Sequence, residues 1–115
     1  MSAGALKDRL RGDLKTAMRE RNQGKVGVIR TLIAAIDNAE AQPIEAFEQR
    51  LRQRETIGEV ARRELDSQAL DAVLAAEIQS RISAAEDYER NGRADDAARL
   101  REEARLIAGY ADSAA

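Results

Sequence analysis

The sequence predicts an all-α fold, two helical hairpins packed as a small bundle, from three observations. Strong helix formers such as Ala, Leu, Arg, Glu and Gln dominate, and the 115 residues include one Pro. Apolar residues recur at steps of three and four along four stretches of the chain, which is the period of an amphipathic helix. Short polar links separate the stretches pairwise, as is typical of antiparallel neighbours. The length suits a single helical domain, 1–115.

The first predicted hairpin spans residues 4–41 and begins with a helix at about 4–22. Its apolar stripe consists of Leu6, Leu10, Leu14, Ala17 and Met18. A basic stripe runs beside it at steps of four and consists of Lys7, Arg11, Lys15 and Arg19. Asn22-Gln23-Gly24 is expected to close this helix, because Gly24 can take the left-handed conformation at little cost.

The second helix of this hairpin is predicted at about 25–41. Its apolar face consists of Val26, Ile29, Leu32, Ile33 and Ile36. Pro43 is expected to end it, because the residue before a proline is pushed out of helical geometry. Residues 42–66 are expected to form a loose, Arg-rich connection. Within them the sequence allows either a short helix at 44–54 with an irregular segment after it, or a mobile linker.

The second predicted hairpin spans residues 67–110. Its first helix is expected to start near Ser67, with Ser67 or Asp66 as the cap, and to end at Asn91 and Gly92. The last helix follows at once, with Asp95 or Asp96 at the end where negative charge favours the helix dipole. The apolar positions of the two helices are Leu70, Val73, Leu74, Ile78, Ile82, Ala85 and Tyr88, then Ala97, Leu100, Ala104 and Ile107.

Several classes of chemistry are excluded by what the sequence lacks. Without Cys or His there is no disulfide, no Cys- or His-based metal site and no histidine general base. The segment 24–27, Gly-Lys-Val-Gly, lacks the Ser or Thr and the preceding strand of a phosphate loop. We therefore predict no catalytic residue, no cofactor and no metal. No apolar run is long enough to cross a membrane, and Lys7, Asp8 and Arg9 interrupt any signal-peptide core, so a cytoplasmic location is expected.

The net charge of −2 is unevenly distributed. Residues 1–36 hold eight basic and three acidic side chains, a net charge of +5 that leaves −7 for residues 37–115. Two interpretations stay open: an anionic partner for the first hairpin, or mutual attraction between the two hairpins. Structured RNA is bound largely through phosphate and 2′-OH contacts, and aromatic side chains for stacking single-stranded bases are few. A ridge for phosphates could be formed by Lys7, Arg11, Lys15, Arg19, Lys25 and Arg30.

Taken in order, several motifs resemble the GatB/YqeY family. The opening helix carries Leu10-x-x-Asp13-Leu14-Lys15-x-Ala17-Met18, and the second carries Val28-Ile29-Arg30-Thr31-Leu32 and Ile36-Asp37-Asn38-Ala39-Glu40. The clearest part of the resemblance is Arg81, Tyr88, Gly92-Arg93-Ala94-Asp95, Glu103 and Tyr110. Two departures are Asp96, where the family usually has Leu, and Ala111-Asp112, where it continues with Leu-Pro and a smaller helical domain. We expect the N-terminal helical domain of that family without its small C-terminal bundle.

The resemblance implies a link to tRNA. The family shares its domain with the tail of the B subunit of the tRNA-dependent amidotransferase, where the tail helps to hold the tRNA and other domains perform catalysis. The leading hypothesis is a non-catalytic accessory domain in translation that binds tRNA or an amidotransferase or synthetase complex. The alternative is a helical protein–protein interaction module without RNA binding. A third hypothesis is a component of a glutamine-dependent tRNA amidotransferase, a carbon–nitrogen ligase.

The residues of this signature also have structural interpretations. Gly92 and Asp95 are expected to cap helices. Tyr88 and Tyr110 are expected at the edge of the core, each with a hydroxyl that needs a partner. Three arginines suit either an ion pair that fixes helix packing or a phosphate contact, and these are Arg30, Arg81 and Arg93. The oligomeric state stays open.

Overall fold

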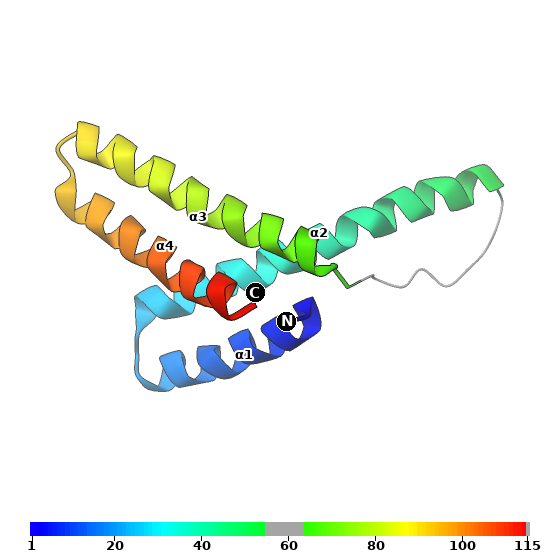
Figure 1. The fold of residues 1–115 in the computed structure, drawn as a ribbon, viewed down its shortest axis with the longest axis horizontal. Helices are drawn as coiled ribbons and strands as arrows, with labels where there is room; N and C mark the ends of the chain where they lie inside the picture. Colours follow the sequence, from blue (N-terminus) through cyan, green and yellow to red (C-terminus); the bar gives the residue numbers. More distant parts are fainter. Residues whose placement is uncertain (55–63, 115) are drawn as a thin grey trace.

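Two antiparallel helical hairpins make up the described part of the chain (Figure 1). The computed structural model describes residues 1–54 and 64–114, with the side chains of 1–41 and 64–112. The first hairpin consists of α1 (Ala3–Arg19) and α2 (Gln23–Arg54), and the second of α3 (Ser67–Arg90) and α4 (Ala94–Ala114). The predicted all-α class and the pairing into two hairpins are therefore confirmed.

The turn between α1 and α2 is built differently from the sequence prediction. Arg21 takes the left-handed conformation, with φ at 57°. The Arg21 N–H donates to the Met18 carbonyl at 3.1 Å and the Asn22 N–H to the Ala17 carbonyl at 2.9 Å, which is a Schellman motif. The prediction that Gly24 fills this role was wrong. Asn22 already caps α2, because its Oδ1 accepts from the Lys25 N–H at 3.1 Å, and Gly24 lies inside the helix.

Pro43 does not end the second helix, and this prediction was also wrong. α2 continues through it to Arg54, so the short helix predicted at 44–54 is part of α2. A proline removes one intrahelical hydrogen bond and disfavours helical geometry in the residue before it. The residues after Pro43 are mostly Glu, Ala, Gln, Leu and Arg, whose helix propensity offsets part of that cost. The irregular segment predicted to follow falls largely on residues 55–63, which lie outside the described residues.

The second hairpin follows the sequence prediction closely at its turn. Gly92 has φ at 74°, its N–H donates to the Glu89 carbonyl at 3.1 Å, and the Arg93 N–H donates to the Tyr88 carbonyl at 2.9 Å. The expected glycine cap is confirmed. Asp95 is not a cap, because α4 begins at Ala94 and places Asp95 inside the first turn. Its charge still faces the favourable end of the helix dipole.

The start of α3 settles a choice that the sequence left open. Asp66 caps the helix, since its Oδ1 accepts from the Ala69 N–H at 2.7 Å, and Ser67 is the first helical residue. At the other end of the hairpin α4 runs to Ala114, beyond the predicted limit of 110.

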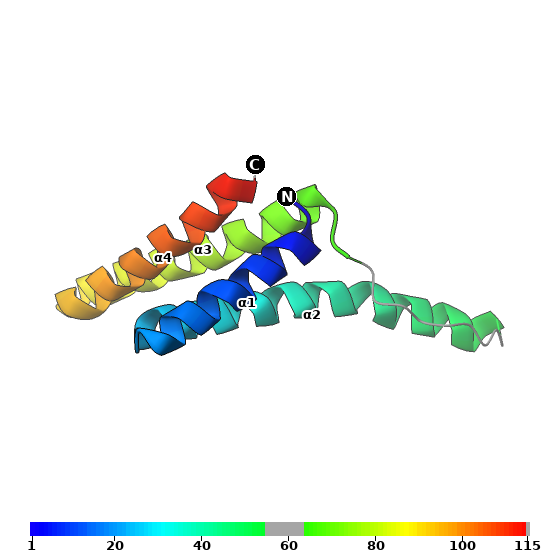
Figure 2. The same ribbon diagram turned by 90° about the horizontal axis from the view of Figure 1, so that it is seen from below.

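The core lies where the two hairpins cross (Figure 2). Its largest fully buried side chains come from all four helices and are Leu6, Leu10, Ile29, Leu32, Ile36, Leu70, Leu74 and Ile107. All of them belong to the predicted apolar stripes. Met18 was assigned to the core wrongly, since it is 51% exposed, whereas Val28 is buried without having been predicted. In α1 the buried position of the last turn belongs to Ala17.

Arg21 gives a direct stability prediction. A side chain in the left-handed region is strained, and glycine removes that strain while adding entropy to the unfolded chain, so Arg21→Gly should stabilise the fold by about 0.5–1 kcal/mol. Thermal unfolding followed by circular dichroism should then shift upward by about 2–4 °C. Arg21→Ala is the matched control, because it removes the same charge and keeps the Cβ atom. An equal gain from both variants would mean that charge, and not backbone strain, limits stability here.

Candidate nucleic-acid interface

The members of the predicted basic stripe of α1 differ in whether they form ion pairs. Lys7 turns toward α2, where its Nζ lies 2.6 Å from Glu40 Oε1 and 3.2 Å from Asp37 Oδ1. Its side chain is only 15% exposed. The hydrogen bond to Glu40 is the main cause that raises the pKa of Lys7 above its ordinary value, and burial works against it. Lys7 therefore crosslinks the first hairpin and presents little charge to solvent.

Glu40, the acceptor of that bond, was not singled out from the sequence. It is a buried carboxylate at 2% exposure, and its second oxygen accepts from the Leu65 N–H at 3.4 Å. Glu64, the residue before Leu65, accepts a hydrogen bond from the Gly4 N–H through its carboxylate. The segment that enters α3 is thus attached to both helices of the first hairpin. Only a position in the helical period could have indicated this role, since Glu40 follows Ile36 by one turn on the buried face.

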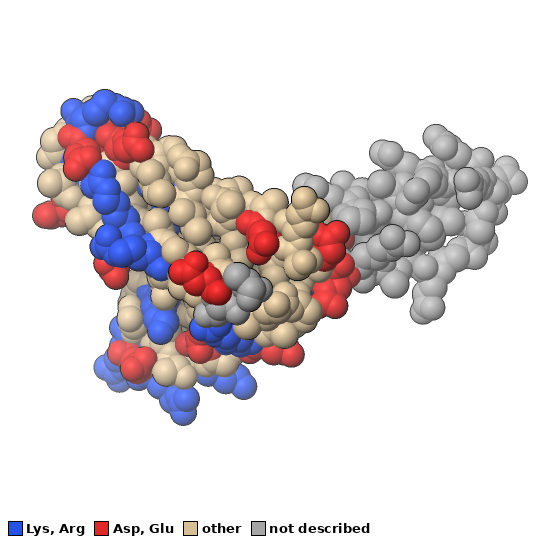
Figure 3. All heavy atoms as spheres, in the orientation of Figure 1, with Lys and Arg blue, Asp and Glu red and all other residues tan. Residues whose placement is uncertain are grey.

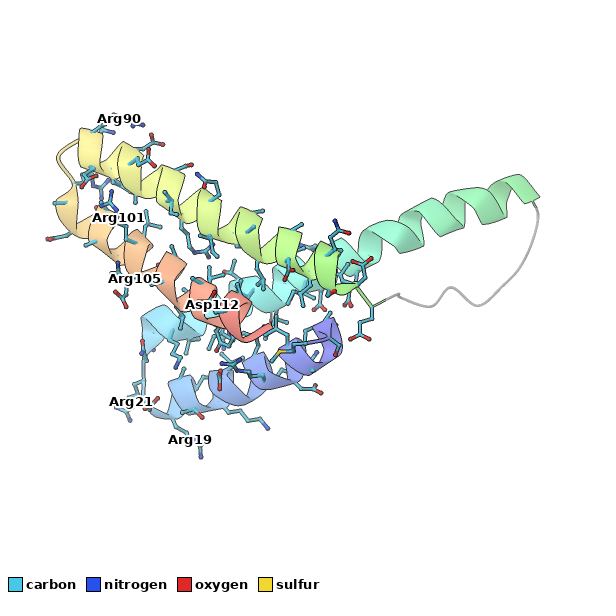
Figure 4. All side chains as sticks on the ribbon, in the orientation of Figure 1. Arg19, Arg21, Arg90, Arg101, Arg105 and Asp112 are labelled. Atoms are coloured by element: carbon cyan, nitrogen blue, oxygen red, sulfur yellow. The ribbon has the colours of Figure 1, made fainter. Side chains whose placement is uncertain are left out.

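The next members of the basic stripe lie progressively closer to the turn. Arg11 forms an exposed ion pair with Asp8 at 3.2 Å, a contact that contributes little to stability. Lys15 and Arg19 are exposed and form no ion pair with any residue that the structure describes. Figure 4 shows Arg19 and Arg21 projecting outward from the end of the hairpin.

We call the unpaired basic residues around this turn the tip patch, and they are Lys15, Arg19, Arg21, Lys25 and Arg30. All but the half-buried Lys25 are exposed, and none has a carboxylate partner within the described ranges. Glu20 is the single acidic residue between positions 15 and 36. At 1.5 Å per residue, the patch members lie within about 12 Å of the turn along the helix axes. Arg21 was not in the predicted set, and it lies outside the stripe at steps of four that gave Lys15 and Arg19.

The arginines of the second hairpin are paired with carboxylates of the same hairpin. Four of these pairs lie along α4 and in the turn before it, and they are Arg93–Asp96 at 2.7 Å, Arg99–Glu103 at 3.0 Å, Arg101–Glu89 at 2.6 Å and Arg105–Glu102 at 2.6 Å. Arg101 also lowers the pKa of Glu89 through its hydrogen bond. In Figure 3 basic and acidic side chains lie side by side at the outer end of this hairpin, whereas α1 forms a lower edge with projecting basic groups.

The three arginines with two open interpretations differ in their environments. Arg81 is 12% exposed and joins α3 to α4, with its Nε 3.2 Å from Glu103 Oε1. Arg93 is 60% exposed, and its guanidinium lies 4.9 Å from the centre of the Tyr88 ring as well as pairing with Asp96. Arg30 is exposed and unpaired within the described part of the chain. Of the three, only Arg30 presents an uncompensated charge.

Tyr110 connects the end of α4 to α1. Its buried hydroxyl donates to Asp13 Oδ2 at 2.5 Å, and the Arg9 guanidinium lies 4.9 Å from the centre of its ring. Burial, and then the hydrogen bond to Asp13, raise the pKa of Tyr110 well above its ordinary value of 10. The expectation of a core-edge tyrosine whose hydroxyl has a partner is confirmed here.

Loss of the Tyr110 hydroxyl should have a pH-dependent cost. At neutral pH Tyr110→Phe should destabilise the fold by about 1.5 kcal/mol, the typical contribution of a hydrogen bond to a charged group. In the folded state the raised pKa keeps the Tyr110 proton in place, while the unfolded chain releases it above pH 10. Parent stability therefore falls as pH rises past 10, and the gap to the variant should narrow. Urea unfolding at pH 7 and pH 11 measures this.

The control for Tyr110 is Tyr88→Phe. The Tyr88 hydroxyl has no hydrogen-bond partner among the described residues, so its removal should cost little at either pH. Equal losses from both variants, or a gap for Tyr110→Phe that does not change with pH, would contradict the role of the Asp13 contact.

Removal of the Glu40 carboxylate should cost much more than removal of an exposed one. Glu40→Ala leaves the Lys7 charge with Asp37 alone and the Leu65 N–H without its acceptor, so we expect a loss of about 3 kcal/mol. Glu102→Ala is the matched control, because it breaks an exposed pair with Arg105 and should change stability by less than about 0.5 kcal/mol. Chemical denaturation of both variants measures the difference, and similar losses would refute the assigned role of Glu40.

The described part of the chain contains no helix long and apolar enough to cross a membrane. Nor does it bring three or more acidic side chains together as a candidate metal site.

Comparison with known proteins shows the family of this chain. No curated protein matches the sequence. The family model of YqeY-like proteins matches residues 7–114, which is nearly the whole length, and this chain therefore belongs to the YqeY-like protein family.

Proposed function

We propose that this protein is a non-catalytic accessory module that binds structured RNA, specifically tRNA, through the tip patch. The observation that carries the proposal is the absence of carboxylate partners for the five tip-patch cations within the described ranges. A phosphate can approach such a group without displacing an existing ion pair. A tRNA partner would also place the protein in the cytoplasm.

The proposed interface is narrower than the set predicted from the sequence. Lys7 and Arg81 are left out because each of them forms a largely buried ion pair. Arg11 and Arg93 are paired at the surface and would have to exchange a carboxylate for a phosphate. The proposed interface keeps Lys15, Arg19, Lys25 and Arg30, and we add Arg21 because it is exposed beside them at the turn.

Shape and backbone contacts suit this surface better than recognition of single-stranded bases. The rings of Tyr88 and Tyr110 each lie under an arginine and are only partly accessible or buried, so neither offers a free stacking surface. Double-stranded RNA is recognised mainly by its shape and by phosphate and 2′-OH contacts, which need cations and not aromatic rings. The relation of this family to amidotransferase tails supports tRNA as the class of RNA.

The protein-interaction hypothesis is supported less well by the described surface. Such a module presents a contiguous apolar patch, and the large hydrophobic side chains exposed in the described residues are Met1 and Met18. Met18 lines a surface hollow together with Lys15 and Arg19, so its surroundings are basic. The amidotransferase hypothesis stays compatible with the proposal in one form, in which this chain holds tRNA for a separate catalytic subunit.

Binding of fluorescently labelled tRNA, followed by anisotropy at several salt concentrations, tests the proposal. Removing one cation that touches a phosphate lowers the slope of log affinity against log salt by about 0.7–0.9. Lys15→Ala and Arg19→Ala should each reduce the slope by about that amount and weaken binding several-fold. Arg90→Ala is the matched control, because it removes one exposed charge that is already paired with Asp87 at the outer end of the second hairpin (Figure 4).

Two results would refute the proposal. One is the absence of tRNA binding even at low salt, where phosphate contacts are strongest. The other is an equal loss of affinity in Lys15→Ala, Arg19→Ala and Arg90→Ala, which would show that overall charge and not the tip patch attracts RNA.

A further inference from the structure

A cavity of about 310 Å³ opens between the start of α2 and the middle of α4. It is lined by Asn22, Gly24, Lys25 and Val28 from the first hairpin, and by Arg99, Glu102, Glu103 and Leu106 from the second. Both hairpins therefore contribute to it, and it adjoins the turn that carries the tip patch. Its volume is at the low end for ligand sites, which suits one small group.

The lining combines an apolar wall with charged groups. Val28 is buried and Leu106 is partly buried against the core, so both present aliphatic surface. The Arg99 guanidinium is held by Glu103 at 3.0 Å, yet its side chain is 57% exposed. Lys25 belongs to both the cavity and the tip patch, and it has no carboxylate partner in the described part of the chain. An anionic group at Lys25 with a flat apolar group behind it would match this arrangement.

An unstacked nucleotide has this chemistry. Its base is planar with apolar faces, its edge carries amino groups that donate to carboxylates, and its phosphate is anionic. Bases that leave the helical stack are bound in proteins by aromatic rings or by the plane of an arginine guanidinium. Arg99 is the planar group here. The acceptor is Glu102, whose Oε2 binds Arg105 and whose Oε1 has no partner among the described residues, whereas both oxygens of Glu103 are engaged by Arg81 and Arg99.

We propose that the cavity takes the base of a single unpaired nucleotide of the bound RNA, with the adjacent phosphate at Lys25. This inference rests on the proposed function and adds to it a structural feature of the RNA. A base that is already unpaired costs little to expose, whereas a paired base must first be unstacked at a cost of a few kcal/mol. The protein should therefore prefer an RNA that offers an unpaired nucleotide over one that is fully paired.

Gly24→Leu fills the cavity without changing the charge of the protein. A Cβ atom at this position meets only Asn22 Oδ1, at an ordinary contact distance of 3.8 Å, so the backbone can accept the side chain. Gly109→Leu is the matched control. It makes the same substitution on α4 outside the cavity, where a Cβ atom meets nothing within 4 Å.

The experiment compares two hairpin RNAs of identical stem sequence, one fully paired and one with a single bulged 2-aminopurine. The parent protein and Gly109→Leu should bind the bulged RNA roughly fivefold more tightly, about 1 kcal/mol, and should change the 2-aminopurine fluorescence. Gly24→Leu should bind both RNAs with the affinity that the parent has for the paired one, and should leave the fluorescence unchanged. Thermal unfolding confirms that each variant is folded.

A second variant keeps the test informative if Gly24→Leu does not fold. Arg99→Ala removes the guanidinium plane from an exposed position and should also reduce the preference for the bulged RNA. If the parent binds both RNAs equally, or if both variants keep its preference, the cavity inference is wrong while the proposed function stands. If the parent binds neither RNA at low salt, the proposed function fails and the inference fails with it.

Discussion

The buried carboxylate of Glu40 is the constraint on which the arrangement of this fold depends. A buried charge is tolerated only when it is paired and hydrogen-bonded. Glu40 meets that condition with Lys7 from α1 and with the Leu65 N–H just before α3, so three parts of the chain converge on one side chain of α2. The bond from Gly4 to Glu64 joins the same region a second time. The hydrogen bond from the Tyr110 hydroxyl to Asp13 attaches α4 to α1, and the two chain ends lie near each other (Figure 1).

These ion pairs and hydrogen bonds also determine which basic side chains are available to bind a partner. Lys7 forms an ion pair with Glu40 at the end of the first hairpin that meets α3, and Arg81 forms one with Glu103 between α3 and α4. At the other end of the first hairpin, the turn between α1 and α2 carries basic residues and only Glu20 to compensate them. The hypothesis that the hairpins attract each other through opposite charge has little support, because each ion pair between described residues stays within one hairpin.

The sequence was informative wherever structure is determined by local pattern. The period of 3.6 residues identified all four helices and the large core side chains, and Gly92 identified a turn that needs a left-handed residue. Prediction failed where distant or competing contacts decide. The partner of Lys7 is 33 positions away, so the stripe at steps of four could not show that its first member faces inward. At the first turn Arg21 takes the left-handed conformation and Asn22 caps α2, so Gly24 lies inside that helix. At Pro43 a long run of helix formers outweighs a local penalty.

The net charge of this chain is −2, so the proposed RNA interface depends on which cations are accessible and not on how many there are. At physiological ionic strength a charge is screened beyond about 8 Å, so the acidic residues of the second hairpin act mainly on the arginines beside them. Those residues form ion pairs with the arginines of α4 and of the turn before it. The tip patch is the place where positive potential is left uncancelled among the described residues. A phosphate backbone that approached any other described basic side chain would first have to displace a carboxylate or an aromatic contact, and that competition favours one docking orientation over the rest.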